Sequence, residues 1–251
     1  MSAGDLPKTE LFSGTTPAEK HFAHVQTWVF DLDNTLYPPN ADLWPKIDQR
    51  ITLFMAEMFG LDGASSRALQ KYYYERYGTT LRGLMTDYAI GPDEFLAFVH
   101  DIDRSSLLPN HTLAGAILAL PGRKLILTNG SRDHALKTAE ALGIDKLFED
   151  VFDIMASNLV PKPEAQAYQM FFDKHGVDPK TAAMFEDLSK NLIVPHARGM
   201  TTTWVVPKPG LIDHRDAWEN DAGAHLPHID YVTNDLEGFL AQIERVIRPE
   251  G

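Results

Sequence analysis

The sequence has no cysteine, which excludes disulfide bonds and any site that needs a thiolate as nucleophile or metal ligand. It also lacks an apolar run near the roughly 20 residues that a membrane-spanning helix needs. The opening residues do not show the charged-then-apolar pattern of a secretory signal. We therefore expect a cytoplasmic protein with no membrane partner.

Positive charge is scarce, because 23 Lys and Arg face 35 Asp and Glu for a formal net charge of −12. Proteins that bind long nucleic acids collect phosphates on a basic face, so this deficit argues against a nucleic-acid polymer as partner. A small anionic substrate remains compatible with it, since a metal ion can outweigh the global field locally. Neither G-x-G-x-x-G after the first expected strand nor G-x-x-x-x-G-K-[ST] occurs, so dinucleotide-dependent redox chemistry has no support.

Short apolar segments alternate with amphipathic helical patterns along most of the chain. Strands are expected at Trp28–Phe30 and at the start of the segments that begin at Lys124, Val151, Thr181, Thr201 and Ile229. One intervening helix is expected to end at Gly143, and another to have Pro163 in its first turn and to end at Gly176. This order predicts an α/β fold with a doubly wound, mostly parallel sheet, whose ligand lies at the carboxyl ends of the strands.

The alternation is interrupted where Leu, Met, Phe and Tyr recur at three- and four-residue spacing, which predicts an inserted α-helical cap. The expected division of the chain is a mobile N-terminal arm at 1–24, a catalytic core at 25–39 and 115–251, and the cap at 40–114. The polar, turn-rich segment Pro209–Asp230 is expected to be a surface loop.

Two aspartates, Asp31 and Asp33, directly follow the first expected strand. With one residue between them, both carboxylates can enter one small site, where they need a cation or a shared proton. Oxygen ligands without cysteine favour a hard ion such as Mg²⁺. For an isolated D-x-D, a turn or a helix cap would be the commoner interpretation.

Polar residues also follow the other expected strands. Thr128, before Asn129, offers a hydroxyl beside the amides of a helix start, which is typical of an anion site. Lys162 lies between two prolines that restrict its backbone. Taken singly, Thr128 would more often be a turn residue and Lys162 a solvated side chain.

An acidic pair, Glu186 and Asp187, follows a further strand, and Asn191 comes four residues after it. Acidic residues are common in the first turn of a helix for electrostatic reasons alone. Four such signals at the same edge of a parallel sheet are nevertheless more specific than any one of them.

In order and spacing these residues resemble the haloacid dehalogenase superfamily: D-x-D-x-T at 31–35, then Thr128, then Lys162, then an acidic pair. The resemblance covers about Trp28 to Gly199, and the helical insertion lies where that superfamily has its cap. The segment YYYERYGTTLRGL, with DLDNTLYPP and FEDLSKNL, resembles the pyrimidine 5′-nucleotidase branch, although many relatives have Gly-Asp in place of Glu-Asp.

The resemblance implies that Asp31 is a nucleophile that forms an aspartyl-phosphate and that Asp33 is the general acid and base. It implies Mg²⁺ bound by Asp31, the backbone carbonyl of Asp33 and Asp187. The other implied roles are phosphate binding by Thr128, Asn129 and Lys162 and support of the metal ligands by Glu186 and Asn191. Because a departing halide needs no proton, the acid at the second position favours phosphoester chemistry.

The cap is expected to select the leaving group. The candidate contacts are Tyr37, Tyr73, Tyr77 and Arg82, which could stack on or hydrogen-bond a base. Tyr72, Tyr73 and Tyr74 are consecutive, so at least one of them should pack inside the cap. A relay through His100 and Asp101 is rejected because adjacent helix residues face apart, and His134 is expected behind the site.

The leading hypothesis is a Mg²⁺-dependent pyrimidine 5′-nucleotidase that acts on UMP or CMP. The alternatives are a phosphatase for a sugar phosphate or pyridoxal phosphate, a phosphomutase, or a binding protein of the same fold that has lost its activity. The partner is then a small phosphate ester, and the oligomeric state is left open.

Overall fold

The computed structural model describes residues 22–211, 213, 215, 219 and 226–247. The expected N-terminal arm, 1–24, lies outside the described residues except for its last three. Of these, Phe22 is 1% exposed and its ring packs against Trp28 and Tyr231. The packed core therefore already includes Phe22, before the expected boundary.

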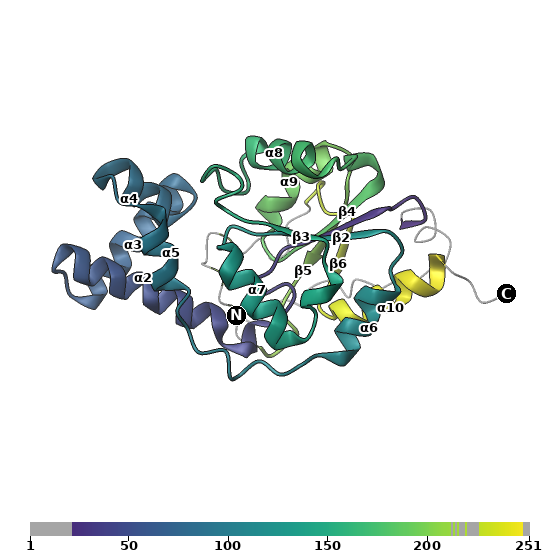
Figure 1. Ribbon diagram of the computed structural model, residues 1–251, viewed down its shortest axis with the longest axis horizontal. Helices are drawn as coiled ribbons and strands as arrows, with labels where there is room; N and C mark the ends of the chain where they lie inside the picture. Colours follow the sequence, from purple (N-terminus) through teal and green to yellow (C-terminus); the bar gives the residue numbers. More distant parts are fainter. Residues whose placement is uncertain (1–21, 212, 214, 216–218, 220–225, 248–251) are drawn as a thin grey trace, which may run out of the picture.

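Among the described residues, six parallel strands form one sheet in the order β3-β2-β1-β4-β5-β6 (Figure 1). They are β1 Thr27–Phe30, β2 Arg123–Leu127, β3 Asp150–Phe152, β4 Ala182–Glu186, β5 Thr201–Val205 and β6 Tyr231–Thr233. The chain builds outward from β1 to β3 and then returns to place β4 on the other side of β1. The crevice outside the carboxyl ends of β1 and β4 is thus the switch point where ligands bind in such sheets. The predicted fold class is confirmed.

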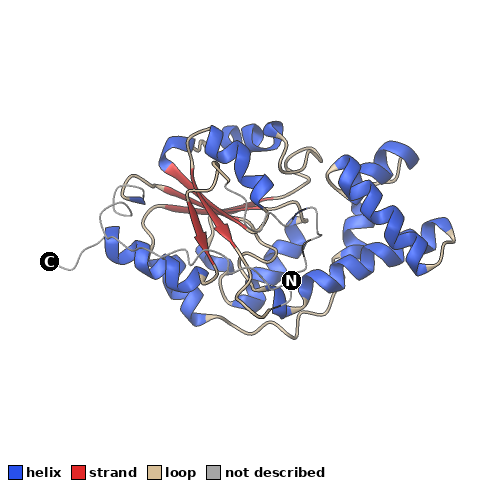
Figure 2. Ribbon diagram, turned by 180° about the vertical axis from the view of Figure 1, so that it is seen from behind, coloured by secondary structure: helices blue, strands red, loops and turns tan. Residues whose placement is uncertain are grey.

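Helices cover both faces of the sheet, as Figures 1 and 2 show. On one face lie α6 His111–Ala119, α7 Arg132–Leu142 and α10 Leu236–Ile247, and on the other α8 Ala165–His175 and α9 Ile193–Ala197. The 3₁₀ turns are η1 Pro39–Ala41, η2 Asp145–Leu147, η3 Pro179–Thr181 and η4 Ser189–Leu192. None of the described helices is both long and apolar enough to cross a bilayer.

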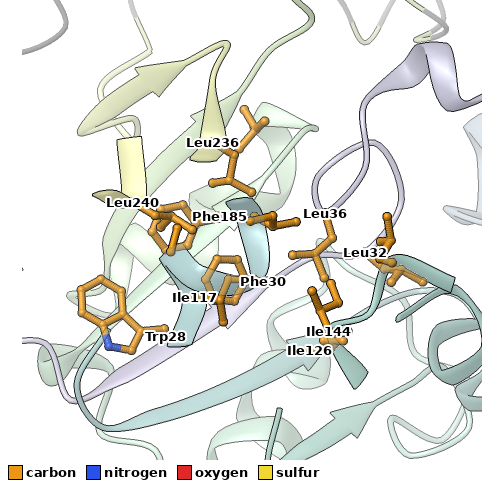
Figure 3. Packing of buried hydrophobic residues seen from close by; sticks show 14 of the residues in the cluster. Trp28, Phe30, Leu32, Leu36, Ile117, Ile126, Ile144, Phe185, Leu236 and Leu240 are labelled. Atoms are coloured by element: carbon orange, nitrogen blue, oxygen red, sulfur yellow. The ribbon is translucent and has the colours of Figure 1, made fainter. Parts of the chain in front are cut away.

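The alternation of side chains along β1 produces the two cores. Trp28 and Phe30 point to the face covered by α6, α7 and α10, where the rings of Phe30 and Phe185 stack with centroids 4.8 Å apart (Figure 3). Val29 points to the other face and packs with residues of α8 such as Phe171. Period-two alternation thus buries both faces of β1 and holds its carboxyl end rigidly.

A group of four helices lies beside the sheet (Figures 1 and 2). They are α2 Leu43–Phe59, α3 Gly63–Tyr77, α4 Thr80–Tyr88 and α5 Pro92–Val99, and they share a hydrophobic cluster of their own. We call residues 43–99 the helical insertion. The next helix, α6, packs against α10 and joins the core of the sheet, so the insertion ends before the expected boundary at residue 114. The spacing of apolar residues predicts that a segment is helical, but it does not predict which hydrophobic core the apolar face of that helix joins.

Helix ends follow the expected chemistry, with one difference. Gly143 and Gly176 adopt left-handed conformations, with φ of 71° and 60°, and end α7 and α8. Pro163 does not lie in the first turn of α8, which begins at Ala165 after a turn that contains Pro163. That turn places Lys162 at the carboxyl edge of the sheet.

Candidate active site

Three carboxylates meet at the crevice between β1 and β4. Asp31 directly follows β1, Glu186 is the last residue of β4, and Asp187 comes next. All three are buried, and one oxygen of each lies within 4.8 Å of the others. Because β1 and β4 are parallel neighbours, residues far apart in the sequence are brought to one edge.

Lys162 places its ammonium among these carboxylates. Its Nζ lies 2.6 Å from Asp31 Oδ1, 2.6 Å from Glu186 Oε2 and 3.0 Å from the carbonyl oxygen of Leu127, and the residue is 2% exposed. Asn129 fixes its backbone, because the Asn129 side chain accepts from Lys162 N at 2.8 Å and donates to Lys162 O at 3.1 Å. The Asn129 side chain, which we expected to bind phosphate, is thus engaged in holding Lys162.

The charges of this cluster do not balance. Burial and the negative charge of Glu186 raise the pKa of Asp31 to about 7, against the opposing attraction of Lys162. Burial and the charges of Glu186 and Asp31 also raise the pKa of Asp187 well above its usual range. Burial lowers the pKa of Lys162, but the charges of Asp31 and Glu186 outweigh burial and raise it, so the ammonium stays charged. One ammonium among three carboxylates leaves a place for a further cation.

The donor atoms around the cluster fit a hard divalent ion. They are carboxylate oxygens, and Asn191 adds an amide oxygen in the wall of the same cavity. Within the described part of the chain, this buried Asn191 Oδ1 has no hydrogen-bond partner. An unpaired buried acceptor next to acidic groups is consistent with a metal ion or its coordinated water.

The turn that follows β2, which we expected to bind an anion, carries a hydroxyl and backbone amides. Thr128 is 3% exposed, and its Oγ1 accepts from Gly130 N at 2.9 Å. Ser131 then caps α7, so the positive end of this helix faces the same cavity. A hydroxyl and helix-terminal amides here could bind phosphoryl oxygens.

Asp33 is held by two donors on one oxygen. Tyr37 donates its hydroxyl to Asp33 Oδ1 at 2.5 Å, and His134 Nε2 lies 2.9 Å from the same atom. Burial raises the pKa of Asp33, but the adjacent His134 and the hydrogen bonds from His134 and Tyr37 outweigh burial and lower it to about 2. Burial and the charge of Asp33 raise the pKa of Tyr37, so its hydroxyl keeps the proton that it donates.

His134 is therefore not behind the site, as its helical position suggested. It lies in the first turn of α7, is completely buried, and faces Asp33 because α7 starts where β2 ends at the same edge. His100 stacks on it, with ring centroids 4.5 Å apart and planes at 10°. Burial and His134 lower the pKa of His100 to about 3, so His100 is neutral at physiological pH. The side chain of Asp101 is 84% exposed, so a proton relay through His100 and Asp101 finds no support here either.

A cavity of about 160 Å³ lies between the helical insertion and the carboxyl ends of the strands. The cavity is lined by the four predicted acidic residues and by the other predicted polar residues, which are Thr128, Asn129, Lys162 and Asn191. Apolar side chains of the insertion, such as Trp44 and Phe95, line its other side. The insertion contributes mainly helical residues to its walls, whereas the core contributes mainly the loops that follow its strands.

The four residues expected to contact the leaving group do not line this cavity. Tyr37 is buried beneath it against Asp33, and Tyr73 is 3% exposed in the core of the insertion. Tyr77 donates to Asp87, and Arg82 forms an ion pair with Glu164. A residue step of about 100° around α3 turns Tyr74, not Tyr73, toward the cavity.

Tyr74 connects the insertion to the core. Its hydroxyl donates to Glu219 Oε1 at 2.5 Å, and Lys190 Nζ also donates to this oxygen, at 2.6 Å. Arg215 donates to the backbone oxygen of Asp187 at 3.3 Å. Glu219 and Arg215 belong to the segment expected to be a surface loop, so its described residues form part of the wall. No motif in the sequence pointed to this contact, which depends on long-range packing.

Comparison with known proteins agrees with this architecture. A family model described as haloacid dehalogenase-like hydrolase matches residues 25–192. Phosphate metabolism protein 8 of Saccharomyces cerevisiae is 29% identical over 147 residues, which are 54% of this chain and only 43% of that protein's length.

Solved structures share the fold. A HAD phosphatase from Thermococcus onnurineus superposes with a TM-score of 0.54 at 17% identity, over 87% of this chain and 99% of that one. An L-2-haloacid dehalogenase from Xanthobacter autotrophicus, with chloropropionic acid covalently bound, has a TM-score of 0.51 at 16% identity, over 90% and 100% of the two chains. Phosphatases and dehalogenases are both among these neighbours, so the fold does not choose between them.

Proposed function

Because the chain belongs to the haloacid dehalogenase-like hydrolases, we propose that it is a Mg²⁺-dependent phosphomonoester hydrolase that acts through an aspartyl-phosphate on Asp31. The observation that carries this proposal is the second acid. Asp33 lines the cavity beside Asp31, and two donors hold it in place. A carbon–halogen bond breaks without a proton donor, whereas an alkoxide leaving group benefits from one.

The first step forms the covalent intermediate. A carboxylate oxygen of Asp31 attacks phosphorus while the bond from phosphorus to the ester oxygen breaks, and Asp33 gives that oxygen a proton. Because the pKa of Asp33 in the free protein is about 2, this proton arrives with the substrate. A phosphate monoester has a second pKa of about 6, so part of it carries a proton at neutral pH.

The second step releases phosphate. Asp33, again a carboxylate, takes a proton from a water molecule as the water oxygen attacks phosphorus, and the bond from phosphorus to Asp31 breaks. Thr128 Oγ1 and the amides at the start of α7 would bind the phosphoryl oxygens. Lys162 would offset the charge of Asp31 and of the phosphoryl group in both steps.

Asp31, Asp187 and the backbone carbonyl of Asp33 would hold the metal ion, and Asn191 would orient this shell. The bound ion would supply positive charge that lets an anionic nucleophile approach an anionic phosphate. The uncompensated carboxylates and the unpaired Asn191 Oδ1 support this assignment.

For the leaving group we propose a nucleoside, with UMP and CMP as the first substrates to test. The support is the wall of the cavity, where Trp44 and Tyr74 offer aromatic surface and Gln70 an amide that can pair with a base. A sugar phosphate or pyridoxal phosphate is the second candidate class, because the same polar groups could bind a smaller leaving group.

The test is phosphate release from UMP, CMP, AMP, a sugar phosphate and pyridoxal phosphate, with Mg²⁺ and with a chelator. We expect kcat/KM to be highest for a pyrimidine nucleotide and activity to be lost with the chelator. Asp31→Asn should lower kcat by at least about 10³-fold. Undiminished release by this variant would refute the assigned nucleophile, and an equally high kcat/KM on a sugar phosphate would refute the nucleotide preference alone.

A further inference from the structure

We propose that His134 is a positioning residue for proton transfer: held by Arg104 in one tautomer, it fixes Oδ1 of Asp33 and leaves Oδ2 as the atom that exchanges the proton with the ester oxygen. This inference rests on the proposed phosphomonoesterase function. It adds a residue to that function which neither the motifs nor the comparisons indicate.

The tautomer follows from the chemistry of Arg104. Its Nη2 lies 2.8 Å from His134 Nδ1, and a guanidinium can only donate, so Nδ1 must be an unprotonated acceptor. The ring then carries its one proton on Nε2, which lies 2.9 Å from Asp33 Oδ1. Arg104 is itself held by the carbonyl oxygens of His100 and Ile102, at 3.2 and 3.1 Å. The hydrogen bond to Asp33 thus has a defined direction.

The two oxygens of Asp33 are not equivalent. Oδ1 accepts from both Tyr37 and His134. Oδ2 lies toward the turn that follows β2, because a methyl group built on Gly130 would come 3.8 Å from Asp33 Oδ2 and 3.3 Å from Thr128 Oγ1. The oxygen next to the expected phosphoryl position is therefore the one that neither donor engages, and rotation of the carboxylate would break two hydrogen bonds.

The imidazole of His134 is itself rigid. It is completely buried, His100 stacks on its face, and Ser131 Oγ lies 2.9 Å from His100 Nδ1. His100 and Arg104 both lie in the stretch of chain that leads from α5 back to the core. A histidine with these contacts could also be a purely structural residue, so the test must separate structure from proton transfer.

Two substrates with different leaving groups make this separation. An alkyl phosphate such as UMP needs a proton on its leaving oxygen, whereas p-nitrophenyl phosphate releases a stable phenolate without one. The parameter is kcat/KM, because it reports the steps up to formation of the aspartyl-phosphate and excludes the later attack of water.

We expect His134→Leu to lower kcat/KM for UMP, or for the best alkyl phosphate found, by about 10²-fold, within the range of general acid catalysis. The loss for p-nitrophenyl phosphate should be less than about 10-fold. His134→Gln, whose amide can still donate to Asp33, should recover part of the alkyl ester activity. His175→Leu is the matched control, because His175 is buried against Phe152 and Phe171 away from the cavity, and it should leave the ratio of the two substrates unchanged.

Equal losses on both substrates in His134→Leu, or no loss on either, would overturn the proposal. If that variant does not fold, Arg104→Met provides the second test, since it frees His134 to take the other tautomer and should give the same selective loss. The proposed function fails separately, if the parent protein releases no phosphate from either ester or if Asp31→Asn remains fully active.

Discussion

Magnesium should stabilise the protein strongly at about pH 8 and only weakly at about pH 5.5. The physical reason is competition with protons for the same carboxylates. The pKa of Asp31 is raised to about 7, and that of Asp187 is raised as well, because burial and Glu186 disfavour their charged forms. Below pH 7 an ion must therefore displace a proton from Asp31 before it can bind.

The magnitude follows from linkage. For one displaced proton with a pKa of about 7, the apparent Kd rises about 30-fold between pH 8 and pH 5.5. Magnesium at about 100 times its Kd stabilises by about 2.7 kcal/mol at pH 8 and by about 0.9 kcal/mol at pH 5.5. For a chain of this size these values correspond to Tm increases of about 5–10 °C and 2–4 °C. Displacement of a proton from Asp187 would enlarge the difference.

Other groups of the folded protein titrate in the same pH range as Asp31. A raised carboxyl pKa contributes stability below its unfolded value, and this contribution is lost as pH rises through the folded value of about 7 for Asp31. His100, with its pKa lowered to about 3, acts in the opposite direction, since stability is lost as pH falls below its unfolded value. The measured quantity is therefore the difference between magnesium and chelator at each pH, in which the His100 contribution cancels.

The assay is thermal or denaturant unfolding in both media across this pH range. Asp187→Asn is the matched variant, and it should lose most of the stabilisation at pH 8 because it removes a ligand while keeping the volume of the side chain. A magnesium effect of the same size at both pH values, or none at pH 8, would refute the assignment of the ion to these carboxylates.

Two further predictions, each with a matched control variant, concern the buried charge of Lys162 and the packing around Gly83. In chelator, Lys162→Met should lower the free energy of unfolding by about 3–5 kcal/mol, because two buried carboxylates lose their countercharge. Lys174→Met, at a half-exposed lysine, is the control and should change the free energy of unfolding by less than about 0.5 kcal/mol. Similar losses in both variants would contradict the role of Lys162 as a buried countercharge. Gly83→Ala should destabilise by about 1–3 kcal/mol, since the new methyl group would lie 2.2 Å from a ring carbon of Tyr73. Gly115→Ala, in an open position within α6, should instead stabilise by about 0.5–1 kcal/mol, and denaturant unfolding distinguishes the two signs.

The architecture and the polar edge of the sheet could be predicted from the chain alone. Alternating apolar strands and helices admit few arrangements, and a parallel sheet brings the carboxyl ends of its strands together. Asp31, Thr128, Lys162 and Asp187 each follow a strand or the turn after it, so their convergence depends on topology and not on details of packing. The order of strands and helices was therefore sufficient to predict that these residues meet at one site.

Other features depend on contacts between segments far apart in the chain, which local patterns do not reveal. Tyr74 faces the cavity while Tyr73 is buried, because the way in which α3 packs sets its rotation. His134 reaches Asp33, 101 positions away, because the α7 helix begins at the edge where β1 ends. The order of residues along the chain sets which chemical groups stand at the ends of the strands, since that follows from the backbone and its pattern. The structure determined their orientation and their neighbours, since these follow from long-range packing that no local pattern encodes.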